Sequence, residues 1–294
     1  MPELPDVTIY VERLRDFVVG ETLSGLRIAS PFVLRSVEPP VERILGQRVV
    51  DVERLGKRIV FTMEQGQCIV VHLMIAGRLR WKKPGAAVPK GNGLAAFDFP
   101  DGTLIFTEAS KKKRASIHLI DSRAELGEVD RGGLEVLEAD LAAFVAALTA
   151  QNHTLKRALT DSRVLSGIGN AYSDEILFAA RLSPFKQTQH LSDEEMTALH
   201  SATTSVLERF TNTLRGEVAE GFPDKVTAFR DDMAVHGRYR QPCVECGSPV
   251  QRIRYADNEA NYCARCQTGG RLLADRALSR LLKANWPKTL DELE

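Results

Sequence analysis

Four cysteines near the C-terminal end limit the possible folds more than any other feature of the chain. They form two pairs, Cys243 with Cys246 and Cys263 with Cys266, each with two residues inside it and sixteen residues between the pairs. This spacing is typical of a hairpin whose two tight turns hold one zinc ion with four thiolates. Two disulfides are the alternative, but they need an oxidising compartment. We therefore expect one structural Zn²⁺ per chain, with no coordination position left open for catalysis.

Length and composition indicate a globular protein with several domains. The 294 residues exceed one ordinary hydrophobic core, which predicts two or three domains. No apolar run approaches the length of a membrane span, and the N-terminus lacks the basic flank and long apolar stretch of an export signal. These features predict a cytoplasmic protein that does not associate with membranes.

The charges are unevenly distributed along the chain, although the net charge is zero. Lys and Arg outnumber Asp and Glu by 18 to 13 in residues 1–120 and by 12 to 10 in residues 223–294, whereas the region between them has 9 against 16. Basic residues concentrate at 78–83, at 111–114 and at 238–254. Each run is either a solvated face or a binding surface for a polyanion.

The N-terminus carries a candidate for covalent catalysis. If Met1 is removed, the chain begins with the secondary amine of Pro2 beside the carboxylate of Glu3. Such an amine can attack an aldehyde-like carbon to form an iminium ion, and the acid can move the protons. Apolar residues at helical spacing predict a helix over 5–18, whose positive end disfavours a protonated amine. An ordinary helix start is the alternative interpretation.

The hydrophobic pattern predicts a multidomain α+β fold. Alternating residues predict strands over 48–53, 58–63, 68–75, 94–99, 103–107 and 116–120, with a turn at 100–102, as in an antiparallel β-sandwich or barrel. Cys68 lies in one of these strands and is expected in the core. The period becomes helical over 135–215, and a last amphipathic helix is expected over 272–282. We expect a β domain at 1–125, a helical domain at 126–222, a zinc-finger region at 223–270 and a C-terminal extension at 271–294.

A glycine hairpin interrupts the helical region. The sequence Gly167-Ile168-Gly169-Asn170 separates two predicted helices. Glycines there allow a phosphate to approach the backbone N–H groups that open the second helix, and Asn170 can donate a further hydrogen bond. The alternative is a glycine cap between two packed helices.

Several separated motifs, taken in order, resemble the formamidopyrimidine-DNA glycosylase and endonuclease VIII family of base-excision repair enzymes, and the start of the chain is closer to the formamidopyrimidine branch. The resemblance covers nearly the whole chain. The matching segments are residues 2–6, 55–58, 72–73 with 77–80, 166–170 with Tyr172 and 174–175, and 237–238 leading into the four cysteines.

This resemblance implies a bifunctional DNA glycosylase and abasic-site lyase that removes oxidised bases from double-stranded DNA as a monomer in the cytoplasm, associated with the nucleoid when on DNA. Pro2 would attack C1′ and form a Schiff base with the sugar, Glu3 would assist proton transfer, and Lys57 would contact a phosphate beside the lesion. The strand would then break by β,δ-elimination. Further DNA contacts are expected from His72, Ile75, Lys111, Lys112, Lys113, Arg114, Lys156, Asn170 and Arg254.

The chain departs from the family pattern at several positions. Ile75 stands where the family has a Met that fills the space of the flipped nucleotide, and residues 110–114 replace the usual Arg and Phe. Asn258 stands at the usual finger Arg, and Asp6 at a usual Glu. The preferred lesion is therefore open. A damaged-DNA-binding protein without catalysis and an RNA-associated zinc protein are the alternatives, and both predict binding without a covalent intermediate.

Overall fold

The computed structural model describes residues 1–223, 226, 230–255, 258–274, 276–282, 285 and 287–292. Two compact units are present: residues 1–131 with 210–228 form unit 1, and residues 132–209 with 229–294 form unit 2. Within the described ranges, no helix is both long and apolar enough to cross a membrane.

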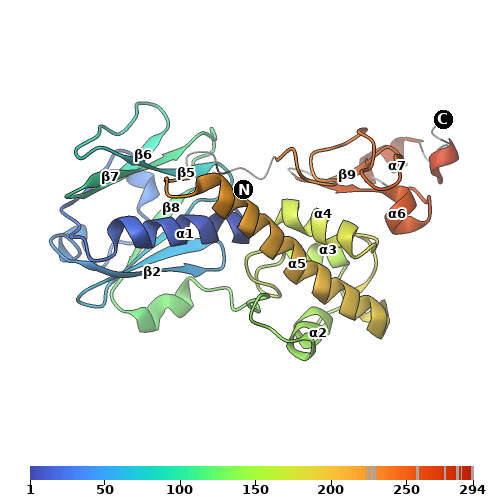
Figure 1. Ribbon diagram of the computed structural model, residues 1–294, viewed down its shortest axis with the longest axis horizontal. Helices are drawn as coiled ribbons and strands as arrows, with labels where there is room; N and C mark the ends of the chain where they lie inside the picture. Colours follow the sequence, from blue (N-terminus) through green and yellow to red (C-terminus); the bar gives the residue numbers. More distant parts are fainter. Residues whose placement is uncertain are drawn as a thin grey trace. The chain divides into compact units, whose positions relative to one another are not determined.

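Unit 1 contains two four-stranded antiparallel sheets (Figure 1). One sheet has the order β1-β6-β7-β5 and the other the order β2-β3-β4-β8. The strands are β1 (Gly25–Ile28), β2 (Val49–Leu55), β3 (Arg58–Met63), β4 (Cys68–His72), β5 (Gly77–Lys82), β6 (Gly93–Phe99), β7 (Gly102–Glu108) and β8 (Ser116–Ile120). Short 3₁₀ turns lie at Pro31–Val33, Val41–Arg43 and Arg123–Glu128.

The core of unit 1 lies where the two sheets meet helix α1 (Leu4–Val18). Phe61 of β3 stacks on Phe97 of β6, with ring centres 6.1 Å apart, so side chains of both sheets interdigitate. Val7, Leu14 and other residues on one stripe of α1 belong to the same core. The hydroxyl of Tyr10 donates to the carbonyl of Leu79, which ties α1 to β5. This packing sets the position of the N-terminal end of α1 within unit 1.

Unit 2 combines helices with a small hairpin. Its helices are α2 (Leu141–Thr149), α3 (Leu155–Thr160), α4 (Asn170–Ala179) and α5 (Asp193–Val218), whose last turns belong to unit 1, with a 3₁₀ turn at Thr188–His190. The hairpin pairs β9 (Gln251–Tyr255) with β10 (Asn258–Tyr262). It is followed by α6 (Ala264–Thr268), α7 (Arg276–Leu282) and a 3₁₀ turn at Leu290–Glu292.

The predicted fold class is confirmed, with differences in individual elements. The helix over 5–18, the hairpin turn before Gly102 and the helical middle region are all present. The strands β1 and β5 were not predicted. β1 is a four-residue strand at the edge of its sheet, and residues 78–83 were interpreted as a basic run although Leu79 and Trp81 alternate with the cations. Helical structure begins at Leu141 instead of 135. The start of the last helix was predicted too early, since residues 272–274 are not helical and the backbone N–H of Leu272 donates to the carbonyl of Lys288; the helix is described over Arg276–Leu282. The domain boundaries drawn from the sequence stay predictions.

Candidate active site

The start of α1 brings two buried acids next to the chain terminus. Glu3 is the N-cap of the helix and is 1 % exposed, and Asp6 in the first turn is 0 % exposed. The backbone N–H of Glu3 donates to Oδ2 of Asp6 at 2.8 Å, and the two residues form a reciprocal capping box. Pro2 is buried as well. The first residues of the chain are therefore held in a fixed conformation.

The electrostatics of this site favour a neutral terminal amine. Burial is the largest cause that lowers the pKa of the terminal amine, here on Met1, below its ordinary value. The positive charges of Arg78 and Lys57 lower this pKa further, whereas the carboxylates of Glu3 and Asp6 raise it. A less basic amine carries a free electron pair at lower pH, which is the form that attacks carbon.

Lys57 and Arg78 reach this site from different sheets. Lys57 lies in the two-residue turn between β2 and β3, after Gly56, whose φ of 59° suits a tight hairpin. Arg78 lies on β5, and its guanidinium donates to the carbonyl of Gly77. Lys57 was predicted as a site residue, and the structure places it within electrostatic reach of the amine. Its contact with phosphate stays a prediction.

Asp6 has features that the sequence did not reveal. Burial, and to a smaller extent the nearby Glu3 carboxylate, raises its pKa to about 7, although the backbone hydrogen bond from Glu3 opposes the shift. Its Oδ1 atom is buried without a hydrogen-bond partner. Asp6 also lines a cavity of about 330 Å³ in unit 1, together with Ile9, Glu217 and Phe222. An orphaned polar atom beside a cavity of this size marks a place for a polar ligand.

His72 lies at the end of β4 among positive groups. Burial is the main cause that lowers its pKa to about 3, and Arg58, Lys57, His118 and Arg131 add to the effect. The ring is therefore neutral near pH 7 and can donate one hydrogen bond without carrying charge. Burial also lowers the pKa of Arg58. This concentration of cations on one sheet suits an anionic ligand, and the predicted DNA contact of His72 stays a prediction.

The segment between β4 and β5 presents Ile75 to solvent, with 53 % of the residue exposed. Met74 before it has a φ of 52°, in the left-handed region that non-glycine residues seldom occupy. Gly77 closes the turn, and a Cβ there would lie 2.2 Å from the carbonyl oxygen of Leu73. The tight turn thus holds an exposed apolar side chain outward, as a wedge residue requires, and its insertion into DNA stays a prediction.

The basic loop between β7 and β8 is organised by Glu108. This side chain is 1 % exposed, and its carboxylate accepts hydrogen bonds from the backbone N–H groups of Arg114 (2.9 Å) and Ala115 (3.1 Å). The ammonium of Lys113 donates to the carbonyl of Glu108. Lys111, Lys112 and Arg114 are exposed. Three of the four predicted cations are therefore available to a ligand, whereas Lys113 is used to close the loop.

Lys156 has its hydrogen-bond partners inside unit 2, and its predicted phosphate contact stays a prediction. Its ammonium is buried and donates to the carbonyl of Asn170 (2.7 Å), to Oγ of Ser173 (2.8 Å) and to Oδ1 of Asp174 (2.6 Å). The other carboxylate oxygen of Asp174 is bonded to Nδ1 of His236 at 2.8 Å. Because an ammonium has three donors, all of them are committed inside unit 2. Lys156 stabilises the start of α4 from within.

The other predicted DNA contacts of unit 2 lie near the hairpin. Asn170 is the first residue of α4, and its Nδ2 donates to the carbonyl of Glu259 on β10 at 2.8 Å. Arg254 is exposed on β9. The carboxylate of Glu175 accepts three backbone N–H groups from residues 234–236, which fixes the segment leading to the cysteines. Contacts of Asn170 and Arg254 with DNA stay predictions.

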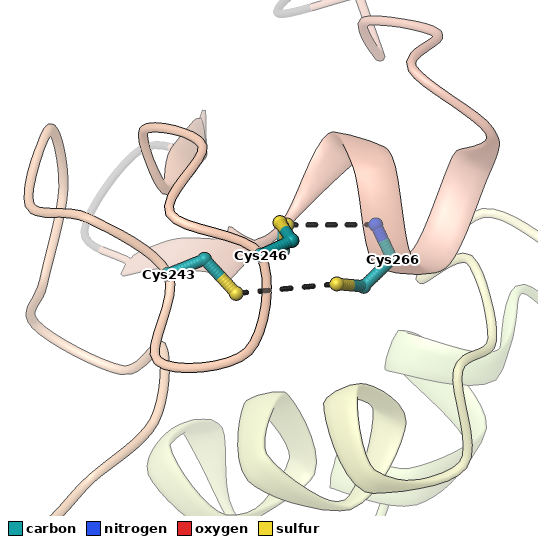
Figure 2. A group of neighbouring side chains, drawn as sticks. Cys243, Cys246 and Cys266 are labelled. Carbon is teal, nitrogen blue, oxygen red and sulfur yellow. Dashed lines mark hydrogen bonds between the residues drawn. The ribbon is translucent and has the colours of Figure 1, made fainter.

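The four cysteines converge as the spacing predicted. Cys243 and Cys246 lie in the loop before β9 and Cys266 on α6, as Figure 2 shows. Their sulfurs and that of Cys263 lie within 4.8 Å of one another, with Cys246 and Cys263 3.4 Å apart and Cys243 and Cys266 4.0 Å apart. These separations exceed a disulfide bond. They bracket the distance of about 3.8 Å between thiolates on a tetrahedral zinc ion, so the four residues fit zinc.

Three residues of the candidate sites were missed at the sequence level, namely Asp6, Arg78 and Glu108. Asp6 was noted only as a variant of Glu, and its position at the third residue of a helix indicates a capping box, not full burial. Arg78 appeared in a basic run and in a segment that matches the family, but was not assigned to the site. Glu108 is the last residue of a strand, and no sequence motif indicated its role. Its partners are the backbone N–H groups of Arg114 and Ala115, which follow the lysine run.

Three family models match successive parts of the chain. Residues 1–121 match the formamidopyrimidine-DNA glycosylase N-terminal domain, residues 133–218 match the formamidopyrimidine-DNA glycosylase H2TH domain, and residues 240–269 match a zinc finger found in FPG and IleRS. The matches cover the N-terminal site, the helices around Asn170 and the cysteine hairpin.

Known proteins are similar over most of the chain. A formamidopyrimidine-DNA glycosylase of Thermus thermophilus is 34% identical over 280 residues, which is 92% of this chain and all of that protein. An uncharacterized formamidopyrimidine-DNA glycosylase-like protein of Mycobacterium tuberculosis is 43% identical over 150 residues, 51% of this chain and 91% of that protein. The crystal structure of the MutM (Fpg) protein from Thermus thermophilus superposes with a TM-score of 0.77 at 31% identity, covering 90% of this chain and 98% of the other. A Lactococcus lactis Fpg in complex with abasic-site DNA has the same fold, with a TM-score of 0.80 at 23% identity over 90% of this chain and 99% of the other.

Proposed function

The chain belongs to the formamidopyrimidine-DNA glycosylase family, and from this membership we infer that it is a base-excision repair DNA glycosylase with abasic-site lyase activity. Its partner is double-stranded DNA that contains damaged bases or abasic sites. One observation carries the mechanism: Pro2, Glu3 and Asp6 lie together in a buried site at the start of α1, where burial also lowers the pKa of the terminal amine on Met1. A buried weak base beside two acids suits nucleophilic attack near neutral pH.

We propose that removal of Met1 places this amine on Pro2, which then attacks C1′ of the damaged nucleoside. The nitrogen electron pair forms the new bond to C1′ while the glycosidic bond breaks, and the base leaves with its electron pair and takes up the proton that the attacking amine releases. Glu3 donates a proton to the sugar ring oxygen as the ring opens, and the nitrogen electron pair freed by that proton loss forms the iminium. Because the iminium acidifies C2′, the 3′ and then the 5′ phosphate can leave by β,δ-elimination.

Two other features support binding of the substrate. The cavity beside Asp6 has a volume of about 330 Å³, enough to take a single base turned out of the duplex. We propose that Lys57, His72, Arg114 and the exposed loop lysines contact phosphates of the DNA. Lys57 acts electrostatically on the terminal amine and on His72, and the cations of the loop are exposed on the same unit. Ile75 would enter the space that the base leaves.

We further propose that the four cysteines hold one structural zinc ion per chain. Since all four ligands come from the protein, zinc would stabilise the hairpin and take no part in the chemistry. Action on DNA as a monomer, in the cytoplasm at the nucleoid, is consistent with this function.

Product analysis tests the function. A duplex with a labelled strand and one 8-oxoguanine, 5-hydroxycytosine or abasic site is incubated with the protein, and the products are separated by gel electrophoresis. The proposal predicts a one-nucleotide gap with a phosphate at each end. Intact strands with every lesion, despite tight binding, would favour damage recognition without catalysis.

A further inference from the structure

Unit 2 gathers two arginines around one aromatic ring at the cysteine hairpin. The Cζ atom of Arg252 lies 4.1 Å from the centre of the Tyr239 ring, and that of Arg240 lies 5.2 Å from it. Both distances are shorter than about 6 Å, the range within which the face of an aromatic ring attracts a cation. Both guanidinium groups therefore lie against the ring of Tyr239.

Arg240 occupies a backbone conformation that favours glycine. Its φ is 68°, in the left-handed region, and its N–H donates to the carbonyl of Val250 at 2.9 Å, so the hairpin imposes this conformation. A glycine would fit without strain, yet the chain has an arginine. Residues held in unfavourable backbone conformations concentrate at functional sites. The backbone conformation does not explain why position 240 is an arginine, so the reason must lie in the side chain.

The described residues neutralise the positive charge of Arg240 and Arg252 only weakly. Arg240 is exposed, and no carboxylate of the described residues forms an ion pair with it. Arg252 has only a 3.7 Å contact with Glu259, in which each side chain is 33% exposed, and pairs of this kind contribute little. Arg254 lies on the same face of β9 as Arg252, because the two are two residues apart on a strand.

The hairpin that carries these arginines is bonded to the start of α4. The carbonyl of Glu259, directly opposite Arg254 in the hairpin, accepts the hydrogen bond from Asn170. Oδ1 of Asn261, directly opposite Arg252, accepts the backbone N–H of Gly237 at 2.9 Å. The strand that pairs with β9 is therefore tied to α4 and to the segment before Tyr239. A guanidinium held in place by packing loses less entropy when it binds a phosphate.

We propose that Arg240 and Arg252, positioned by Tyr239, form a binding site for a phosphate of the DNA backbone. The inference rests on the proposed function, because a DNA partner supplies the phosphates. A planar guanidinium can donate two parallel hydrogen bonds to phosphate oxygens. Tyr239 has a positioning role, since its ring is covered by cations and is not free to stack on a base.

The salt dependence of DNA binding tests this site. The zinc-loaded protein and its variants are titrated with a fluorescent duplex that contains a tetrahydrofuran abasic-site analogue, at several salt concentrations. Arg240→Gly should weaken binding about tenfold and reduce the slope of log K against log salt by about 0.9, the value for one phosphate contact. It should keep its zinc and melt no lower than wild type, because glycine relieves the backbone.

Matched variants distinguish an effect of the charge at position 240 on DNA binding from an effect of changed folding. Arg240→Lys should restore the slope, and Tyr239→Phe, which keeps the ring, should bind like wild type, whereas Tyr239→Ala should bind more weakly. Arg163→Gln is the control, since Arg163 belongs to the same unit but is paired with Asp161 at 2.7 Å; its slope should not change.

The outcomes are distinguishable. A wild-type slope for Arg240→Gly, with wild-type protein that binds the duplex and cleaves abasic DNA, would overturn the phosphate site alone. A wild-type protein that does not bind the duplex would overturn the proposed function as well.

Discussion

The backbone N–H of Glu3 donates a 2.8 Å hydrogen bond to Oδ2 of Asp6, which joins the acid expected to move protons to a carboxyl group that is fully buried. Because burial raises the pKa of Asp6 from 3.8 to about 7, the folded state holds a proton that the unfolded chain releases above pH 4. Folding stability should therefore fall as pH rises from about 4 to 7.

The variant Asp6→Asn tests this relationship. The asparagine keeps an oxygen that accepts the hydrogen bond from the N–H of Glu3, but it cannot ionise. The folding stability of the variant should therefore not decrease between about pH 4 and pH 7 as that of the wild type does. The shift corresponds to a differential effect of about 4 kcal/mol between wild type and variant from pH 4 to pH 8. Urea unfolding at both pH values measures it. Equal pH dependence of the two proteins would show that Asp6 is ionised in the fold.

Lys57 should tune the amine as well as bind phosphate. Its charge lowers the pKa of the terminal amine, so Lys57→Gln should raise that pKa. The acid limb of the rate of Schiff-base formation should then move to higher pH, while Lys57→Arg should leave it near the wild-type position. Rates of borohydride trapping between pH 5 and 9 give the profile. A rate that falls equally at every pH would assign Lys57 to binding alone.

Glu108 should determine whether the basic loop keeps its conformation. Glu108→Ala leaves the N–H groups of Arg114 and Ala115 without their acceptor, and unsatisfied buried donors cost about 1 to 3 kcal/mol each. We expect a lower melting temperature and weaker DNA binding. Glu125→Ala, on an exposed 3₁₀ turn, is the control. Unchanged melting of Glu108→Ala would mean that the loop is held by other contacts.

The turn that presents Ile75 should depend on Gly77. In Gly77→Ala the new Cβ would collide with the carbonyl oxygen of Leu73, which should cost about 1 to 3 kcal/mol. Gly127→Ala is the matched control, since a Cβ there meets nothing within 4 Å. Denaturant unfolding of both variants compares them. Equal stability would show that the turn relaxes without cost.

Removal of the metal should disorganise the hairpin. A chelator removes the zinc ion, and Cys263→Ser removes one of its ligands. Phe178 of α4 packs in the same cluster as Cys243 and Cys263, so loss of the metal should also disturb this packing. DNA binding should therefore fall together with zinc content, measured by atomic absorption. Cys68→Ser, in unit 1, should keep one zinc per chain. Full DNA binding without zinc would contradict a structural role.

Features that depend on neighbouring residues in the sequence could be predicted, and features that depend on tertiary burial could not. The cysteine spacing and the helix after Pro5 are local, so they identified the metal site and the position of the terminus. Lys156 looks like a surface cation in sequence, because nothing near it indicates that Ser173 and Asp174 face it across a turn. The raised pKa of Asp6 likewise arises from packing of α1 into the core.

Covalent trapping tests the central claim most directly. The protein, with its N-terminus determined by mass spectrometry, is mixed with abasic-site DNA and borohydride, and the adduct is digested and sequenced. The account predicts a reduced sugar adduct on Pro2, present in Glu108→Gln and absent when the terminal amine is acetylated or Met1 is retained. An adduct on a lysine, or none while the strand is still cut, would contradict catalysis by the N-terminal amine.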